Sequence, residues 1–343
     1  MKKELWFCIF GWLCCSCVVR AENWMGRLAD DAFVAEVSIP GAHDAATGSG
    51  WAGVKGLIGN RFAKTQDLDI QQLWDVGVRA FDLRPALHKH YMSMNHGMVA
   101  TDLRFEEVLT RMCGWLKANP SEFIIIHLLH AGDGDKVKGD YASRLVEVLH
   151  RREYLGYLAD FKPDLRVGEL RGKILILSRN NYSNNPVGGI FYNWTGAADW
   201  NRQTRGRIVG KGGTSGRVYM QDFSSTYFPG AINTKVAAVE RMLEFSSTHK
   251  ASDSNSVVWV LNFASAYSKV LRLFGHSIST SNGYRDNAVH THATFLRFLA
   301  AHPSGSTGIV LMDYAGVDKS HGYQVNGRLL VRAIIDSNFS KLN

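Results

Sequence analysis

Residues 122–129, with the sequence EFIIIHLL, decide the fold class of this chain. Apolar side chains follow one another without alternation, so both faces of a strand formed here must be covered. Residues 173–177 (KILIL) and 309–312 (IVLM) have the same character. Strands of this kind occur in parallel sheets with helices on the outside, and the sequence therefore predicts an α/β protein.

Apolar strand-like stretches recur along the chain and alternate with amphipathic helical patterns. Strands are predicted at residues 36–39, 78–83, 91–94, 122–128, 173–177, 217–221, 257–262 and 308–312. Helices are predicted at residues 68–76, 105–117, 141–158, 231–248, 285–301 and 326–338. We expect an irregular (βα)8 TIM-type barrel rather than a sandwich. The irregularity lies at residues 85–90, which are too few for a crossover helix.

The composition is that of a globular protein with an exported N-terminus. The chain has 343 residues, of which 45% are hydrophobic, and we expect one catalytic barrel domain over residues 24–343. Residues 1–21 combine Lys2 and Lys3, an apolar run and a small-residue cleavage pattern ending at Ala21, which is typical of a secretory signal peptide. The alternative is a lipoprotein signal cut near Cys17. Either reading predicts a secreted or extracytoplasmic protein, in the periplasm or at the cell surface.

Cysteine content and charge limit the other possibilities. Four of the five cysteines lie in residues 1–21, so the mature chain retains Cys113 alone and can form no internal disulfide. The formal net charge is +8 and becomes +6 after cleavage, which favours anionic surfaces such as acidic membranes. No basic stripe interleaved with aromatic residues and no nucleic-acid-binding motif is present, so nucleic acid is not an expected partner.

Polar residues stand at or just after the predicted strand ends, where the active face of a parallel barrel lies. They are His43, Asp82, Arg84, His96, Asp222 and Asp313. Two histidines can move two protons near neutral pH, and a guanidinium can bind a phosphate through two donors. Together with the neighbouring Asp44, these are the groups needed to cleave a phosphodiester without a metal. Taken singly, each could instead be a turn residue, a helix cap or a structural ion pair.

Metal binding is not expected from the histidines, although there are 13 of them. Neighbouring pairs such as His127 and His130 have no HExxH or CxxC companion. A cation placed beside Arg84 would also be repelled by it. The sequence therefore predicts no metal and no other cofactor.

Seven segments, in order, resemble the bacterial phosphatidylinositol-specific phospholipases C, the X-domain phosphodiesterases. They are SIPGAHD (38–44), KTQDLDIQQLWDVGVRAFDLRP (64–85), NHG (95–97), NPSEFIIIHL (119–128), ELRGKILILS (169–178), YMQDFS (219–224) and GIVLMDY (308–314). The resemblance implies an irregular barrel and a metal-independent lyase. Such an enzyme converts phosphatidylinositol to diacylglycerol and inositol 1,2-cyclic phosphate.

The resemblance also implies roles for individual residues. His43 would be the general base, oriented by Asp313, and His96 the general acid; Asp44 and Arg84 would bind and polarise the phosphate. Arg171, Asp222 and Asp82 would contribute to substrate binding. The chain departs from the family pattern at Ser224, where a ring-packing tyrosine is expected, and at Leu129, where a lysine is expected. These departures leave the headgroup preference open.

Two other functions remain open on the sequence. One is a metal-dependent glycerophosphodiester phosphodiesterase on a similar barrel, and the other is a non-catalytic inositide-binding surface module. The glycine-rich residues 48–60 are either a flexible loop or a rim that touches lipid. We expect a monomer acting on phosphatidylinositol or a glycosyl-phosphatidylinositol-type lipid at a membrane surface.

Overall fold

The structure is a computed structural model that describes residues 23–53, 56–194, 204–226, 230–268, 271–273 and 276–340. The predicted signal peptide lies outside the described residues. Within them, no helix is long and apolar enough to cross a membrane.

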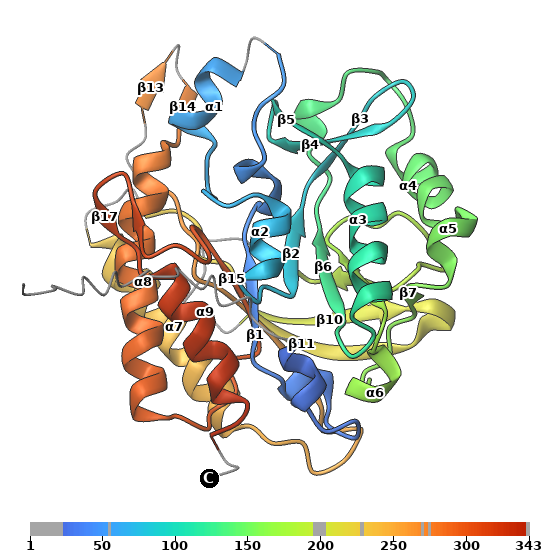
Figure 1. The fold of residues 1–343 in the computed structure, drawn as a ribbon, viewed down its shortest axis with the longest axis vertical. Coiled ribbons are helices and arrows are strands. Elements are labelled where there is room, and N and C mark those ends of the chain that lie inside the picture. Colours follow the sequence, from blue (N-terminus) through green and yellow to red (C-terminus); the bar gives the residue numbers. More distant parts are fainter. Residues whose placement is uncertain are drawn as a thin grey trace, which may run out of the picture.

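Nine strands close into a barrel, which confirms the predicted fold class (Figure 1). They are β1 (Ile39–Ala42), β2 (Ala80–Leu83), β6 (Ile124–Leu128), β8 (Ile174–Ser178), β9 (Gly189–Tyr192), β10 (Thr204–Gly210), β11 (Ser215–Gln221), β12 (Val258–Phe263) and β15 (Ile309–Met312). Their order is β6-β2-β1-β15-β12-β11-β10-β9-β8, and the pairing of β8 with β6 closes the ring. The short strand β7 (Leu158–Ala159) adds to the beginning of β8. Only β10 runs antiparallel to its barrel neighbours, β9 and β11.

The predicted third strand, residues 91–94, is not a barrel strand. It belongs to a separate antiparallel sheet of β3 (Pro85–Leu87), β4 (Met92–His96) and β5 (Val99–Arg104). The reason is the short connection between β2 and β4, which allows a hairpin but no crossover. The strands β9 and β10 take part in the barrel instead, although the sequence TRGRIVG of β10 has the glycines and charges that usually argue against a strand.

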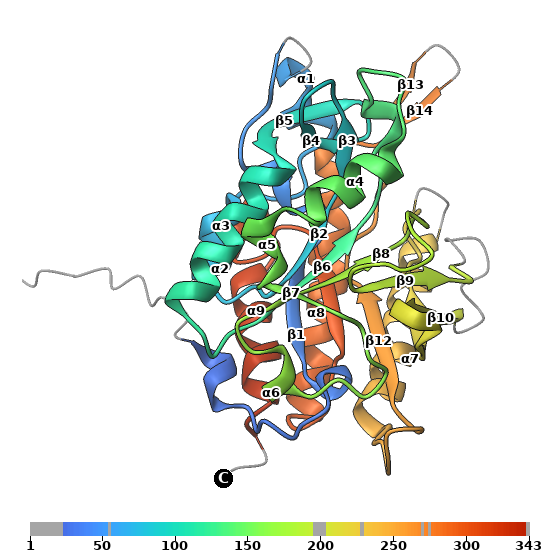
Figure 2. The same ribbon diagram turned by 90° about the vertical axis from the view of Figure 1, so that its right-hand side faces the viewer.

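Helices surround the barrel, most of them on its outside (Figure 2). They are α1 (Gly56–Phe62), α2 (Ile70–Asp75), α3 (Phe105–Ala118), α4 (Tyr141–Leu149), α5 (Arg152–Leu155), α6 (Val167–Leu170), α7 (Ala231–Thr248), α8 (Ser281–Ala301) and α9 (Gly327–Ser337). The predicted helix at 141–158 is divided into α4 and α5. Short 3₁₀ helices lie at Trp24–Arg27, Val34–Glu36, Ala45–Gly48, Gly132–Gly134 and Lys211–Gly213, and small hairpins are formed by β13 (Leu271–Leu273) with β14 (His276–Ile278) and β16 (Lys319–Ser320) with β17 (Tyr323–Gln324).

Two hydrophobic layers show which side chains point into the barrel. In β6, Ile124 and Ile126 pack in the layer between the barrel and its helices. Ile125 points the other way and packs with side chains from other barrel strands, in the layer inside the barrel. Because successive side chains alternate across a strand, His127 shares the inner side with Ile125. Five other strands have an apolar residue in this inner layer: Ile39, Ala80, Leu177, Met220 and Leu311. By the same alternation, the residues at the carboxyl ends of these strands that also point inward are 43, 82, 179, 222 and 313.

Candidate active site

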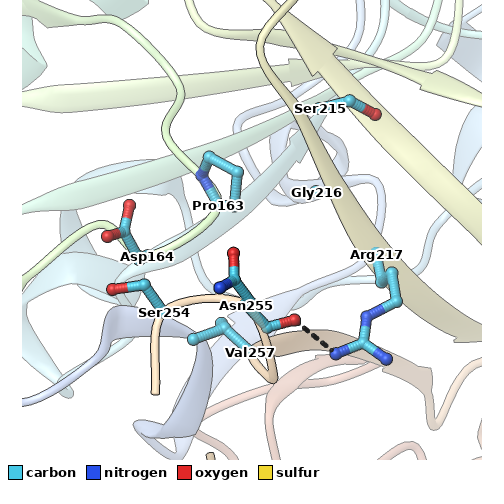
Figure 3. A pocket seen from close by; sticks show the side chains of 8 residues that line it. All are labelled: Pro163, Asp164, Ser215, Gly216, Arg217, Ser254, Asn255 and Val257. Carbon is cyan, nitrogen blue, oxygen red and sulfur yellow. Dashed lines mark hydrogen bonds between the residues drawn. The ribbon is translucent and has the colours of Figure 1, made fainter.

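The polar residues predicted from strand ends meet at the carboxyl end of the barrel. Figure 1 shows that the β3-β4-β5 sheet, α1 and the β13-β14 hairpin lie beyond this end. At the opposite end, a polar pocket of about 240 Å³ lies between residues that include Pro163, Asp164 and Arg217 (Figure 3). The guanidinium of Arg217 there donates to the backbone carbonyl of Asn255, and the pocket contains no histidine. The candidate active site is therefore the carboxyl end.

His43 is held between a carboxylate and a guanidinium. Its Nδ1 lies 2.7 Å from Oδ1 of Asp313, and its Nε2 lies 2.7 Å from Nη2 of Arg84. A guanidinium only donates hydrogen bonds, so Nε2 must present its lone pair and Nδ1 must carry the hydrogen. Burial and then the charge of Arg84 lower the pKa of His43 well below its ordinary value. The imidazole is therefore neutral, with its basic nitrogen in the site.

Arg84 is fixed by two buried carboxylates. Its Nε and Nη2 donate to Oδ2 of Asp82 at 3.2 and 2.7 Å, and its Nη1 lies 3.1 Å from Oδ2 of Asp44. Burial lowers the pKa of Arg84, but Asp44 and Asp82 raise it by more, so the guanidinium remains charged. Its side chain is 17% exposed, which leaves one edge available to a bound anion.

Asp82 lies behind Arg84 and does not reach the substrate side, which corrects its predicted role in substrate binding. The side chain is 0% exposed, and both oxygens are in use. Oδ2 accepts from Arg84 and from the backbone N–H of Asp44 at 3.0 Å, while Oδ1 accepts from Nδ1 of His127 at 2.8 Å. Burial raises the pKa of Asp82, but Arg84 and His127 lower it further, so the net pKa is well below the ordinary value. Asp82 is a positioning residue for Arg84.

His96 lies on the other side of Asp44 from Arg84. Its Nδ1 is 2.7 Å from the backbone oxygen of Ala63 and 3.1 Å from Oδ2 of Asp44. A carbonyl oxygen only accepts, so Nδ1 carries a hydrogen. The Nε2 atom points to the hydroxyl of Tyr284 at 3.3 Å. Asp44 reaches both partners from a left-handed backbone conformation with φ of 47°, an uncommon conformation for a residue other than glycine.

Asp222 lies at the rim of the site, in a cluster with Trp194 and Arg179. Its Oδ2 accepts from Nε1 of Trp194 at 3.1 Å and lies 3.5 Å from Nη1 of Arg179. The guanidinium of Arg179 also stacks over the Trp194 ring at 4.1 Å. This cluster faces the aromatic ring of Phe263, which in turn lies against His43.

Arg171 is not in the site, and its predicted role in substrate binding is wrong. It precedes β8 and therefore lies at the amino end of the barrel, opposite the active face. Its guanidinium donates to Asp30 and to the backbone oxygens of Met25, Leu28 and Ser121, which ties the N-terminal segment to the barrel. Arg179 directly follows β8 and is therefore the arginine at the carboxyl end of this strand, where the site residues lie.

Three buried polar residues near the site were not predicted. His127 in β6 is enclosed by the rings of Phe191, Trp194 and Phe263, and its Nε2 has no hydrogen-bond partner. Lys235 of α7 is fully buried and donates to Oε1 of Gln221 at 3.0 Å; burial lowers its pKa to about 7. Tyr284 of α8 contacts His96. In the described part of the chain, no group of three or more histidine, cysteine, aspartate or glutamate residues could hold a metal ion.

Comparison with known proteins finds phospholipases C that act on phosphatidylinositol. No protein-family model matches the chain. A 1-phosphatidylinositol phosphodiesterase of Staphylococcus aureus is 29% identical over 329 residues, covering 92% of this chain and 94% of the relative. A solved structure of a phosphatidylinositol-specific phospholipase C from the same species has a TM-score of 0.71 at 26% identity, with 93% of this chain and 98% of that chain covered. Over nearly its whole length, the chain is similar to bacterial phosphatidylinositol-specific phospholipases C.

A second bacterial phospholipase C has a similar fold. The phosphatidylinositol-specific phospholipase C of Listeria monocytogenes has a TM-score of 0.64 at 20% identity and matches 92% of this chain. A Listeria monocytogenes 1-phosphatidylinositol phosphodiesterase is 30% identical over 169 residues, about half of either chain.

Proposed function

We propose that this protein is a metal-independent phospholipase C that cleaves phosphatidylinositol to diacylglycerol and inositol 1,2-cyclic phosphate. The observation that supports this most directly is the contact between Arg84 and the lone-pair nitrogen of His43. A nitrogen able to act as a general base thus lies beside a cation able to bind phosphate, and Asp44 contacts both that cation and a second histidine, His96.

The substrate phosphate changes the partner of Arg84. In the free site, Nη2 of Arg84 donates to Nε2 of His43, so the base is occupied. A bound phosphodiester competes for the same guanidinium through charge-assisted hydrogen bonds and releases the lone pair. His43 then accepts the proton of the inositol 2-hydroxyl, while Asp313 stabilises the imidazolium through Nδ1. The base thus becomes available when the phosphate is in place.

Bond formation and bond breaking follow in one displacement. The inositol oxygen attacks the phosphorus, Arg84 stabilises the charge that develops on the non-bridging oxygens, and the bond to the glycerol oxygen breaks. His96 gives its Nε2 proton to that oxygen, which leaves as diacylglycerol. Because nucleophile and phosphate belong to one molecule, the reaction is intramolecular and gives a cyclic product.

The rim cluster suits the headgroup. Asp222 accepts hydrogen bonds and Arg179 donates them, so together they can bind adjacent hydroxyls of inositol. A site built for hydroxyls rejects headgroups that lack them, because its buried polar groups would lose partners. A panel of phospholipids with different headgroups tests this specificity; equal cleavage of phosphatidylcholine would contradict it.

Product analysis with a chelator separates the proposed reaction from its alternatives. With EDTA present, phosphorus NMR should show the cyclic inositol phosphate early in the reaction, and His43→Ala or His96→Ala should lower turnover by about 10²–10⁴-fold. Loss of activity in EDTA with recovery on adding Ca²⁺ or Mg²⁺ would indicate a metal-dependent glycerophosphodiesterase. Binding of inositide vesicles without turnover would indicate a binding module.

We also propose that the protein is exported and works as a monomer on a membrane surface. The signal-like residues 1–21 support export, which N-terminal sequencing of the mature protein tests. Ile58 of α1 and Met98 of the β4–β5 turn are 44% and 52% exposed, and α1 lies against β5 at the carboxyl end of the barrel. Ile58→Ser and Met98→Ser should weaken sedimentation with phosphatidylinositol vesicles. Leu155→Ser, at a leucine of α5 that is 50% exposed, is the matched control.

A further inference from the structure

We infer that Tyr284 and Ser279 form a proton relay that returns a proton to His96 after each cleavage. The inference rests on the proposed function, since it takes His96 as the general acid. The hydroxyl of Tyr284 lies 3.3 Å from Nε2 of His96 and 2.8 Å from Oγ of Ser279. Ser279 is partly exposed, so the three groups connect the active site with solvent.

Tyr284 differs from other buried tyrosines in the partners of its hydroxyl group. The hydroxyls of Tyr154, Tyr182 and Tyr314 donate to backbone carbonyl oxygens. Such an oxygen only accepts, which fixes the direction of the hydrogen bond. The hydroxyl of Tyr284 instead lies between a histidine nitrogen and a second hydroxyl, both of which can donate or accept. Its hydrogen-bond direction can therefore reverse.

Both protonation states of His96 are satisfied by this arrangement. Because Nδ1 faces the Ala63 carbonyl and keeps its hydrogen, the neutral imidazole presents a lone pair at Nε2. The Tyr284 hydroxyl then donates to Nε2 and accepts from Ser279. When His96 is protonated, Nε2–H donates to Tyr284, whose hydroxyl donates to Ser279. A phenylalanine would fill the same space but would serve neither state.

The surroundings keep the tyrosine itself neutral. Tyr284 is 4% exposed, and burial raises its pKa. The hydrogen bond with Ser279 and the charge of Arg84 lower this pKa by less, and Asp313 and Asp44 act in the same direction as burial. These three charged groups, with His96, are those that face it electrostatically from the barrel. A neutral phenol transfers a proton only in concert with a second transfer, which the bond to Ser279 allows.

The relay balances the proton that His96 loses in one cycle, while the proton that His43 takes from the inositol hydroxyl is released to solvent separately. In the cleavage step, His96 loses its Nε2 proton to the glycerol oxygen. Tyr284 then gives its hydroxyl proton to Nε2 and takes the hydroxyl proton of Ser279, which takes one from water. The net change is one proton moved from solvent to His96. The contact of 3.3 Å is long for a hydrogen bond between oxygen and nitrogen, so Nε2 can turn from Tyr284 to the leaving oxygen during the reaction.

Comparing the first turnover with the steady state tests the relay. With enzyme in excess, one turnover uses only a proton that Nε2 of His96 already carries and needs no relay, so Tyr284→Phe should cleave phosphatidylinositol at a rate within about twofold of the wild type. Under steady-state turnover, it should lose about tenfold or more of kcat, less than the 10²–10⁴-fold expected on losing His96 itself, and added imidazole buffer should restore part of the loss. Ser279→Ala keeps the tyrosine and should show a smaller loss of the same kind. Tyr154→Phe, which removes a buried hydroxyl far from His96, is the matched control and should lose nothing.

Each other result overturns a defined part of the argument. Equal losses in the first turnover and in the steady state, without a response to buffer, would mean that Tyr284 only positions His96. Unchanged steady-state rates in both Tyr284→Phe and Ser279→Ala would mean that the hydroxyls take no part. If Tyr284→Phe does not fold, as judged by circular dichroism, Ser279→Ala alone decides. A wild-type protein that does not cleave phosphatidylinositol would refute the proposed function itself.

Discussion

Replacing Asp82 with asparagine tests whether the orientation of Arg84 determines the rate. The carboxylate holds Arg84 through two hydrogen bonds and also accepts from the Asp44 backbone and from His127. The amide oxygen of asparagine can face Arg84 and Asp44, which leaves the NH₂ group toward His127. His127 can then accept at Nδ1 and carry its hydrogen on Nε2, the atom that has no partner now. The exchange is therefore compatible with the fold.

Asp82→Asn removes a negative charge and leaves the shape of the side chain nearly unchanged, so its effects on stability and rate come from the lost charge. Arg84 exchanges two hydrogen bonds with a carboxylate for weaker ones with an amide, and a hydrogen bond to a charged group contributes about 1.5–3 kcal/mol. Asp44 remains as the second partner, so the loss in unfolding free energy should stay near the lower end of the 3–5 kcal/mol expected when a buried ion pair loses one member. Misplacing one group that stabilises the charge of the transition state typically lowers kcat about 10²–10³-fold, which we expect for Asp82→Asn.

The assay measures kcat on phosphatidylinositol in detergent micelles and the unfolding free energy in urea. Asp336→Asn, at an exposed carboxylate of α9, is the control and should change neither quantity. A value of kcat within threefold of the wild type, in an Asp82→Asn protein that folds, would show that Asp82 does not position Arg84 for the reaction.

Four further predictions follow from buried histidines and a buried lysine. Because burial and Arg84 lower the pKa of His43, kcat/KM should persist below about pH 6.5, the ordinary histidine value, and fall only as pH drops through the lowered pKa; an acid limb at or above 6.5 would contradict this. His127→Asn keeps a donor near Nδ1 and should retain activity within about threefold, whereas His127→Gln, with its donor near Nε2, should lose roughly tenfold, about the contribution of one hydrogen bond. Lys235→Met should raise the unfolding free energy by up to about 5 kcal/mol below pH 7, because the lysine pKa rises from about 7 to its ordinary value on unfolding. This gain should decline toward pH 10, and an unchanged urea midpoint would contradict the prediction. Burial lowers the pKa of His292 to about 4, so on acidification the unfolded state is protonated at this residue before the folded state is. Between pH 7 and 4, the unfolding free energy of the wild type should therefore fall by about 3 kcal/mol more than that of His292→Asn, as measured by urea titration.

The sequence predicts the inner part of the site well because strand geometry determines it. His43, Arg84 and Asp313 follow strands whose apolar sequences are unambiguous, and parallel strands bring their carboxyl ends to one edge. The alternation of side chains then directs these residues to the barrel interior. His96 was found as a residue after a strand, but that strand belongs to the β3-β4-β5 sheet, so its position depends on the hairpin.

The rest of the site depends on contacts that no local pattern contains. Arg171 and Arg179 flank the same strand, and the family resemblance selected the wrong one, because a motif match does not show at which end of a strand a residue lies. Tyr284 and Lys235 come from helices, where the hydrophobic period shows that a face is buried but not what it faces. The sequence does not predict the strand β10. Its extended backbone is stabilised by pairing with β9 and β11 rather than by a strand-like pattern in its own sequence.

The charges of the inner site connect phosphate binding with the base His43. Asp44 and Asp82 contact the guanidinium of Arg84, whereas Asp313 contacts Nδ1 of His43. A phosphodiester adds a further negative charge, which favours the protonated form of a nearby histidine. Once the phosphate takes the guanidinium, His43 also loses the neighbouring positive charge that lowers its pKa. Substrate binding thus prepares His43 to accept the proton of the inositol hydroxyl, while the departure of the products restores the contact with Arg84 and favours release of that proton.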